Sequence, residues 1–486
     1  MTSEKQFLAD ICESPDDLDA RRVFADWLME RSDPWGELIA TQLQLGGMKG
    51  GEKDYPELLA HSFRLQSKVA EKLIKPIKKL IGVEQIDYGR VKIDEYQNAR
   101  FQNGFISQIA IRPEDIHKKW SKLSKLQPID SVEMLVPEAI EIDKDLSSIA
   151  LNWRRIKTSA EGWTTIFGVY PIFTWDLPKL ESLDLSGCDL NSDCRLLLGD
   201  ETGLEEYVEL LGKPMPQIKQ LPKTLVELKL MGTNIQEATL QEVLALKNLK
   251  NLHTLDVSQC NLSESATFDS IKALKKLKRL YMSGIKGDLG NLAGWAGLEK
   301  LECLSLPQTI EVAGFQKLFP KPSAKLNELH LSAAKTLLAE PAVVASAAKK
   351  LFHLNIGSTS VGDEGLAKLL DAKPVHSVVH LALNKCGLSE QGIESLVNSK
   401  LKRLVTLDVS SNKLTDASLE KLAESGLLRN VVHLRIRNNR KLTHAGLEAL
   451  TNCDHFDPVK LDVGKCKDKK SESMLKETFG SAMVLE

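Results

Sequence analysis

Residues 404–414 read L-V-T-L-D-V-S-S-N-K-L, a pattern that predicts one short strand followed by a turn. Leu404, Leu407 and Val409 are spaced to face one side of the strand, and Asn412 follows where the chain must turn. One such stretch can bury very little apolar surface by itself. A stable fold therefore requires that the pattern be repeated and that neighbouring copies stack on one another.

The same apolar spacing does recur, over more than half of the chain. The other copies, written by their apolar positions, are Leu180-Leu183-Leu185, Leu225-Leu228-Leu230, Leu252-Leu255-Val257, Leu277-Leu280-Met282, Leu301-Leu304-Leu306, Leu326-Leu329-Leu331, Leu351-Leu354-Ile356, Val378-Leu381-Leu383, Val431-Leu434-Ile436 and, with Pro458 in the first position, Leu461-Val463. From Leu228 to Leu461 the central leucines lie 24 to 27 residues apart. This period is typical of leucine-rich repeats.

The segments that return from one strand to the next carry helical patterns. Leu366, Leu369 and Leu370 share one helical face, and Ser389 and Thr415 stand where helix N-caps belong. The sequence therefore predicts an α/β fold, a curved solenoid or horseshoe with parallel strands inside and helices outside. The repeats resemble the ribonuclease-inhibitor type of leucine-rich repeat, a class that includes the Ran GTPase-activating proteins.

Composition narrows the class of protein. The formal net charge of −2 argues against a nucleic-acid or membrane binder, and no apolar run reaches membrane-spanning length. The first residues contain no apolar signal core, and the eight cysteines have no paired spacing. We expect a cytoplasmic protein that binds no nucleic acid and does not insert into membranes.

Residues 1–82 predict a small all-α domain. Its most distinctive part is a helix that ends at Ser32-Asp33-Pro34 and is followed by a second helix. This part resembles the bacterial repeat-companion domain, which precedes repeat arrays in planctomycetes and myxobacteria. The resemblance rests on Arg21, Val23, Phe24, Ala25, Asp26, Trp27, Leu28, Glu30, Pro34, Gly36, Glu37, Ile39 and Gln42. Trp35 departs from it, and we interpret that departure as extra packing; the resemblance implies an architecture and no reaction.

A basic amphipathic helix is predicted over residues 55–81. Such a helix can lie on an anionic membrane or bind a partner, or it can pack on the end of the solenoid with its lysines in water. The near-neutral chain and Pro76 favour the last interpretation. Residues 83–178 are predicted to form irregular capping repeats, with tryptophans concentrated in 152–178. Residues 179–486 form the solenoid, interrupted by an insertion near 191–222 that is a secondary candidate binding site.

The inner face of the strands is the main candidate site. At its ends, the outward residues Asp184-Lys229-Asp256 and Asp408-Arg435-Asp462 are expected to neutralise one another across neighbouring strands. The centre carries polar and aromatic groups without such pairing, as recognition of a protein partner requires. The predicted partner-binding residues are Arg279, Tyr281, Glu328, His330, His353, Asn355 and His380.

Other chemistries are less well supported by the sequence. The histidines could bind a transition metal, but we favour hydrogen bonding to a partner and predict no metal and no cofactor. Cys188, Cys260, Cys386 and Cys466 occupy one turn position and are interpreted as structural. No catalytic motif is present. We therefore expect a non-enzymatic protein-interaction scaffold whose partner is unknown; the alternative is a regulator of an enzyme such as a small GTPase, by fold analogy.

Overall fold

A computed structural model describes residues 3–81, 101–136, 146–160, 169–190, 195–199, 219–286, 288–466 and 468–484. Most of the predicted insertion near 191–222 lies outside these residues. The chain divides into two compact units. The N-terminal unit consists of the described residues of Met1–Ala40, Val69–Arg90 and Gln97–Gly297, and the C-terminal unit of those of Thr41–Lys68, Val91–Tyr96 and Leu298–Glu486.

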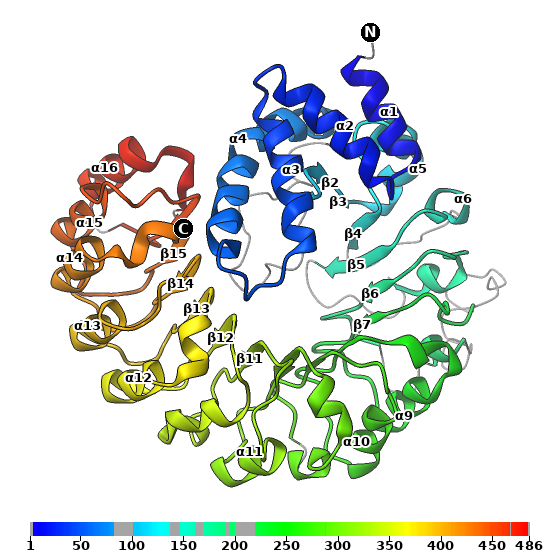
Figure 1. The fold of residues 1–486 in the computed structure, drawn as a ribbon. Helices are drawn as coiled ribbons and strands as arrows, with labels where there is room; N and C mark the ends of the chain where they lie inside the picture. The colour runs from blue at the N-terminus through cyan, green and yellow to red at the C-terminus, as the bar shows by residue number, and fades with distance from the viewer. Residues whose placement is uncertain are drawn as a thin grey trace. The chain divides into compact units, whose positions relative to one another are not determined.

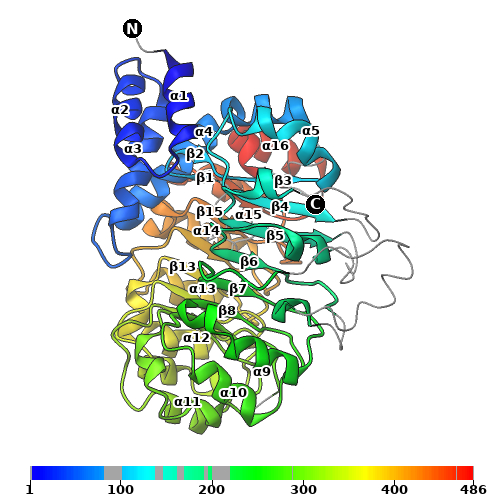
Figure 2. The ribbon, with the colours of Figure 1, turned by 90° about the vertical axis from the view of Figure 1, so that its right-hand side faces the viewer.

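The N-terminal unit contains a parallel sheet with its strands in chain order (Figures 1 and 2). The strands are β3 (Gln108–Ile111), β4 (Ser131–Val136), β5 (Arg155–Ala160), β6 (Ser182–Asp184), β7 (Glu227–Lys229), β8 (Thr254–Asp256) and β9 (Arg279–Tyr281). A small antiparallel pair, β1 (Phe101–Gln102) and β2 (Phe105–Ile106), precedes them. The helices are α1 (Glu4–Glu13), α2 (Leu18–Met29), part of α3 (Pro34–Gly47), part of α4 (Tyr55–Ile81), α5 (Pro113–Leu123), α6 (Ser147–Ala150), α9 (Glu237–Ala245) and α10 (Ser265–Lys272).

The C-terminal unit repeats the same plan with greater regularity. Its parallel strands are β10 (Cys303–Ser305), β11 (Glu328–His330), β12 (His353–Asn355), β13 (His380–Ala382), β14 (Thr406–Asp408), β15 (His433–Arg435), β16 (Lys460–Asp462) and β17 (Met483–Val484). Its return helices are α11 (Val312–Leu318), α12 (Gly362–Leu370), α13 (Glu390–Val397), α14 (Asp416–Glu424), α15 (His444–Thr451) and α16 (Lys469–Phe479). In Figure 1, helices α12 to α16 lie on one side of these strands. The predicted α/β solenoid of strand-and-return repeats is confirmed.

The repeated leucines form the core of each unit. In the quoted repeat, Leu404 is 1% exposed and Leu407 and Val409 are fully buried. The central leucines pair in register, for example Leu381 with Leu407 and Leu407 with Leu434. Burying a leucine side chain stabilises a fold by about 1.5–3 kcal/mol, so stacking of many such repeats supplies what one repeat cannot. Ser389 and Thr415 cap α13 and α14 as predicted.

The turn that follows each strand is held by the next repeat. Asn412 Nδ2 donates to the carbonyls of Leu383 and Val409, both at 2.9 Å. Asn412 Oδ1 accepts the backbone N–H groups of Cys386, at 3.0 Å, and Leu388, at 3.1 Å. One side chain therefore satisfies buried backbone groups in its own repeat and in the preceding one.

Cysteine serves the same turn position in other repeats. The Sγ of Cys386 donates to the carbonyl of Ile356 at 3.3 Å, and that of Cys260 donates to Leu230 at 3.0 Å. Burial raises the pKa of Cys386 to about 11, so the side chain remains a neutral thiol. These contacts agree with the structural interpretation of the turn cysteines.

Replacing Asn412 by alanine removes five hydrogen bonds from a buried turn, including one from Nδ2 to the carbonyl of Ser410 at 3.2 Å. Because a buried backbone group without a partner costs about 1–3 kcal/mol, we expect Asn412→Ala to lower the free energy of unfolding by roughly 2–4 kcal/mol. Urea titration of the full chain measures this loss. Lys413→Ala, a change at the neighbouring exposed side chain, is the control and should unfold like the wild type. Equal unfolding midpoints for the two variants would contradict this role of Asn412.

Candidate functional site

In-register pairing arranges the outward side chains of the C-terminal unit in two columns. The first column, from the first strand position, is Cys303, Glu328, His353, His380, Thr406, His433 and Lys460. The second column, from the third strand position, is Ser305, His330, Asn355, Ala382, Asp408, Arg435 and Asp462. Residues two apart on a strand point to the same side, so both columns lie on one face.

The second column ends in the predicted charge ladder. Arg435 lies 3.7 Å from an Asp408 oxygen and 3.4 Å from an Asp462 oxygen. Arg437 adds a further contact to Asp462 at 3.6 Å. Asp462 is 1% exposed, so this network is part of the packed structure rather than an open surface.

The corresponding ladder of the N-terminal unit has an additional member. Lys229 pairs with Glu227 of the same strand at 3.1 Å, and Ser182 donates to Glu227 at 2.7 Å. Burial alone would lower the pKa of Lys229, but Glu227, Asp184 and Asp256 together raise it. Lys229 therefore stays charged within a set of carboxylates. Sequence reasoning placed the two aspartates beside Lys229 and missed Glu227, its direct partner.

The structure brings the three predicted histidines of the C-terminal unit together. The rings of His330 and His353 lie 4.6 Å apart, centre to centre, and those of His353 and His380 lie 5.6 Å apart. His353 is only 8% exposed. Burial lowers the pKa of His380 to about 4, and its Nδ1 lies 3.1 Å from the hydroxyl of Thr406. His353 is thus largely covered, whereas His380 is half-buried and bonded to the neighbouring strand.

The remaining predicted residues are more accessible. Glu328, His330 and Asn355 are half-buried on β11 and β12 of the C-terminal unit. Arg279 and Tyr281 are half-buried on β9 of the N-terminal unit, where the Nε of Arg279 donates to the hydroxyl of Tyr281 at 3.3 Å.

A helix of the chain itself covers part of the strand face in the C-terminal unit. In the first half of α4, Leu59, Ala60 and Phe63 pack against Val379, Val405, Val432 and Val459. Each of these valines directly precedes a strand of β13 to β16. The ring of Phe63 also lies 4.9 Å from that of His433. We call the four valines the valine stripe.

Polar contacts fix the position of this helix within the C-terminal unit. The Nη2 of Arg403 donates to the carbonyls of Gly50, at 2.9 Å, and Glu52, at 2.6 Å. Within the helix, Arg64 pairs with Asp457 at 3.0 Å. The helix therefore packs on the repeats, as predicted, but beside four successive strands and not only on an end. Sequence reasoning missed the signal for this contact: an additional valine before the outward positions of four successive repeats.

The helices of the N-terminal unit are anchored through Trp35. Its Nε1 donates to the carbonyl of Gly104 at 2.7 Å, and its ring meets Phe24 and Phe105 at 5.1 and 5.4 Å between centres. The side chain is 1% exposed. Trp35 thus provides extra packing, the role inferred from its departure from the companion-domain pattern.

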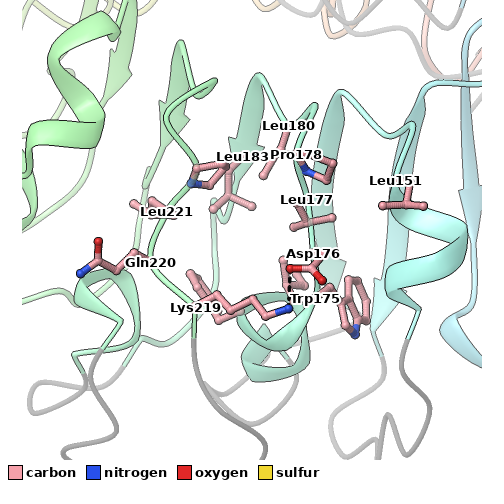
Figure 3. A pocket seen from close by; sticks show the side chains of 13 residues that line it. Leu151, Trp175, Asp176, Leu177, Pro178, Leu180, Leu183, Lys219, Gln220 and Leu221 are labelled. Carbon is pink, nitrogen blue, oxygen red and sulfur yellow. Dashed lines mark hydrogen bonds and ion pairs between the residues drawn. The ribbon is translucent and has the colours of Figure 1, made fainter.

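The N-terminal unit also contains an apolar pocket of about 400 Å³ (Figure 3). It joins the tryptophan-rich stretch to the end of the predicted insertion. Its lining includes Leu151, Phe173, Trp175, Leu180, Leu183, Lys219 and Leu221. Lys219 reaches Asp176 at 2.5 Å, as the dashed line in Figure 3 marks. The tryptophan-rich stretch and the end of the insertion, the secondary candidate site, therefore contribute to one cavity.

Comparison with known proteins supports the repeat assignment. A family described as "Leucine Rich repeat" matches residues 176–193 and 401–423. No curated protein matches this chain. Within the described residues, none of the helices combines the length and the apolar character that crossing a membrane requires.

Two solved structures resemble the fold over most of their length. One comes from the Rad7 and Elc1 complex of yeast, with a TM-score of 0.48, 14% identity, and coverage of 87% of this chain and 94% of that one. The other is an internalin of Listeria monocytogenes, with a TM-score of 0.28, 15% identity, and coverage of 84% and 96%. Similarity at these levels indicates no function for this chain.

Burial of His433 predicts a pH-dependent stability. Desolvation, with Lys460 and Arg435 nearby, lowers the pKa of His433 to about 3, whereas an unfolded histidine titrates near about 6.5. The unfolded chain thus binds the proton more readily, so stability is complete above the unfolded pKa and falls as pH drops towards the folded one. At about pH 5.5 the loss amounts to about 1.4 kcal/mol.

Thermal unfolding of the wild type and His433→Gln at several pH values measures this effect. We expect the melting temperature of the variant to decline less steeply between about pH 7.5 and about pH 5.5. Parallel declines would show that His433 is not buried in its neutral form.

Proposed function

We propose that this leucine-rich-repeat chain is a non-enzymatic scaffold that binds a protein partner on the strand face of its repeats. The observation that supports the proposal is the packing of α4 on the valine stripe, a contact between the repeats and an amphipathic helix of the chain itself. The contact residues proposed for the partner lie outside this covered stripe. The proposal also includes a cytoplasmic location, on the composition argued above.

The contact residues of the proposal follow from their accessibility. In the N-terminal unit they are Arg279 and Tyr281, which belong to the residue types that most often anchor protein interfaces. In the C-terminal unit they are Glu328, His330, Asn355 and His380, all half-buried, while the buried His353 packs between His330 and His380.

The charges of the N-terminal unit indicate the chemistry of the partner. Outward charges alternate along β4 to β7, with Glu133 pairing with Lys157 at 3.2 Å and Lys229 with Glu227 at 3.1 Å. Such a surface presents positive and negative charges close together. These charges determine the orientation of a bound partner more than its affinity. We therefore propose a partner with a mixed polar surface and one apolar or aromatic anchor.

Capture on the immobilised full chain, followed by mass spectrometry, identifies the partner, and titration with the purified partner then gives the affinity. We expect Arg279→Ala combined with Tyr281→Ala to weaken binding by about 2 kcal/mol or more, roughly 30-fold. Arg195→Ala is the matched control, because Arg195 pairs with Glu242 of the return helix α9, away from the strands.

The outcomes separate the alternatives. Normal affinity of the double variant, together with loss of binding in Trp175→Ala, would place the site at the apolar pocket instead of the strand face. If the captured partner is a GTPase whose hydrolysis the chain accelerates, the chain is a regulator of an enzyme, the alternative that fold analogy suggests.

A further inference from the structure

Three side chains of different ligand chemistry meet on neighbouring strands of the C-terminal unit. The Sγ of Cys303, a carboxylate oxygen of Glu328 and a ring nitrogen of His330 all lie within 4.8 Å of one another. Cys303 is fully buried, and Glu328 and His330 are half-buried. The cluster is therefore close to the interior and still reachable from solvent.

Strand register explains why these three residues meet. Cys303 of β10 pairs directly with Glu328 of β11, and neighbouring strands lie about 4.8 Å apart. Glu328 and His330 are two residues apart on β11, so their side chains leave the same face. Two adjacent strands thus supply three donor atoms to one point, without a contribution from any mobile loop.

The donor set suits a zinc-like metal ion. Zinc binds cysteine sulfur at about 2.3 Å and histidine nitrogen or carboxylate oxygen at about 2.0–2.2 Å. Ligand atoms of a tetrahedral site then stand about 3.3–3.8 Å apart, so closing the cluster requires movements of about 1 Å. A set that combines sulfur with nitrogen disfavours magnesium and calcium, which prefer oxygen ligands.

The surroundings of the cluster would support bound metal. His353 packs against His330 with 4.6 Å between ring centres, and it pairs with Glu328 across β11 and β12. Tyr55, at the start of α4, lies near Glu328: burial raises the pKa of its phenol, and the charge of Glu328 raises it further. Such neighbours hold the residues that bind a metal directly in the orientation that binding requires.

Cys303 also differs in position from the turn cysteines. Cys260 and Cys386 donate to backbone carbonyls of the preceding repeat, which accounts for their presence. Cys303 instead occupies an outward strand position beside a glutamate.

We propose that Cys303, Glu328 and His330 form a binding site for a divalent transition metal of the zinc type. Three protein ligands leave a fourth position for water, the arrangement of an open zinc site. The inference departs from the sequence prediction of no metal, which considered the histidines without Cys303 and Glu328 beside them. It shares Glu328 and His330 with the proposed partner contacts, but its test measures metal binding by the chain alone and needs no partner.

The test uses the full purified chain, stripped with a chelator and dialysed against zinc chloride or cobalt chloride. We expect one metal ion per chain by elemental analysis and a rise in melting temperature with zinc, because a ligand that binds the folded state stabilises it. Cobalt should give a thiolate-to-metal charge-transfer band. That band should disappear in Cys303→Ser, and His330→Ala and Glu328→Gln should each weaken zinc binding by about tenfold or more.

Matched controls are Cys386→Ser, at a buried turn cysteine, and His376→Ala, at a half-buried histidine of the same unit; both should bind zinc and cobalt as the wild type does. Circular dichroism establishes that each variant is folded, and the more accessible His330 keeps the test decisive if Cys303→Ser does not fold. The proposal is overturned if the wild type retains no stoichiometric zinc, or if His330→Ala and Glu328→Gln retain it as firmly as the wild type does.

Discussion

The turn hydrogen bonds between neighbouring repeats are the constraint on which the C-terminal unit depends. Asn412 donates to Leu383 and accepts from Cys386 in the repeat before it, and Asn439 in turn accepts the N–H of Asn412 at 3.0 Å. Each buried backbone group would cost about 1–3 kcal/mol without its partner, so sliding one repeat past the next is strongly disfavoured. Parallel strands with an unbroken register are the consequence.

That register turns a linear sequence into columns of side chains. Whatever residue stands at an outward strand position meets its equivalents in the adjacent repeats about 4.8 Å away. Charges of alternating sign therefore become the ladder of Asp408, Arg435 and Asp462, and Cys303 comes to lie beside Glu328 and His330. The residue types in each column therefore determine what the surface can bind, because the backbone geometry is the same in every column.

The same periodicity creates the surface that holds α4. One valine before each of four strands is unremarkable in its own repeat, but stacking places the four side by side as an apolar stripe in the C-terminal unit, on which Leu59, Ala60 and Phe63 of the helix pack. Arg403 and Arg64 then bind the chain at either end of this contact. An apolar stripe of this kind would bind a partner if it were exposed. In this chain the chain's own helix covers it.

The sequence by itself determined the repeat, its period, the buried leucines, the capping positions Ser389 and Thr415 and the ladder at Arg435, because each depends on spacing within a repeat or on identical spacing between repeats. Only the tertiary structure decided which side chains of the candidate site are covered. The burial of His353, the packing of α4 and the approach of Cys303 to Glu328 and His330 depend on rotamers and on contacts between residues far apart in the chain. Trp35 lies between these cases: its departure from the companion-domain pattern indicated packing, but Gly104, which accepts its hydrogen bond, is 69 residues away and was visible only in the fold.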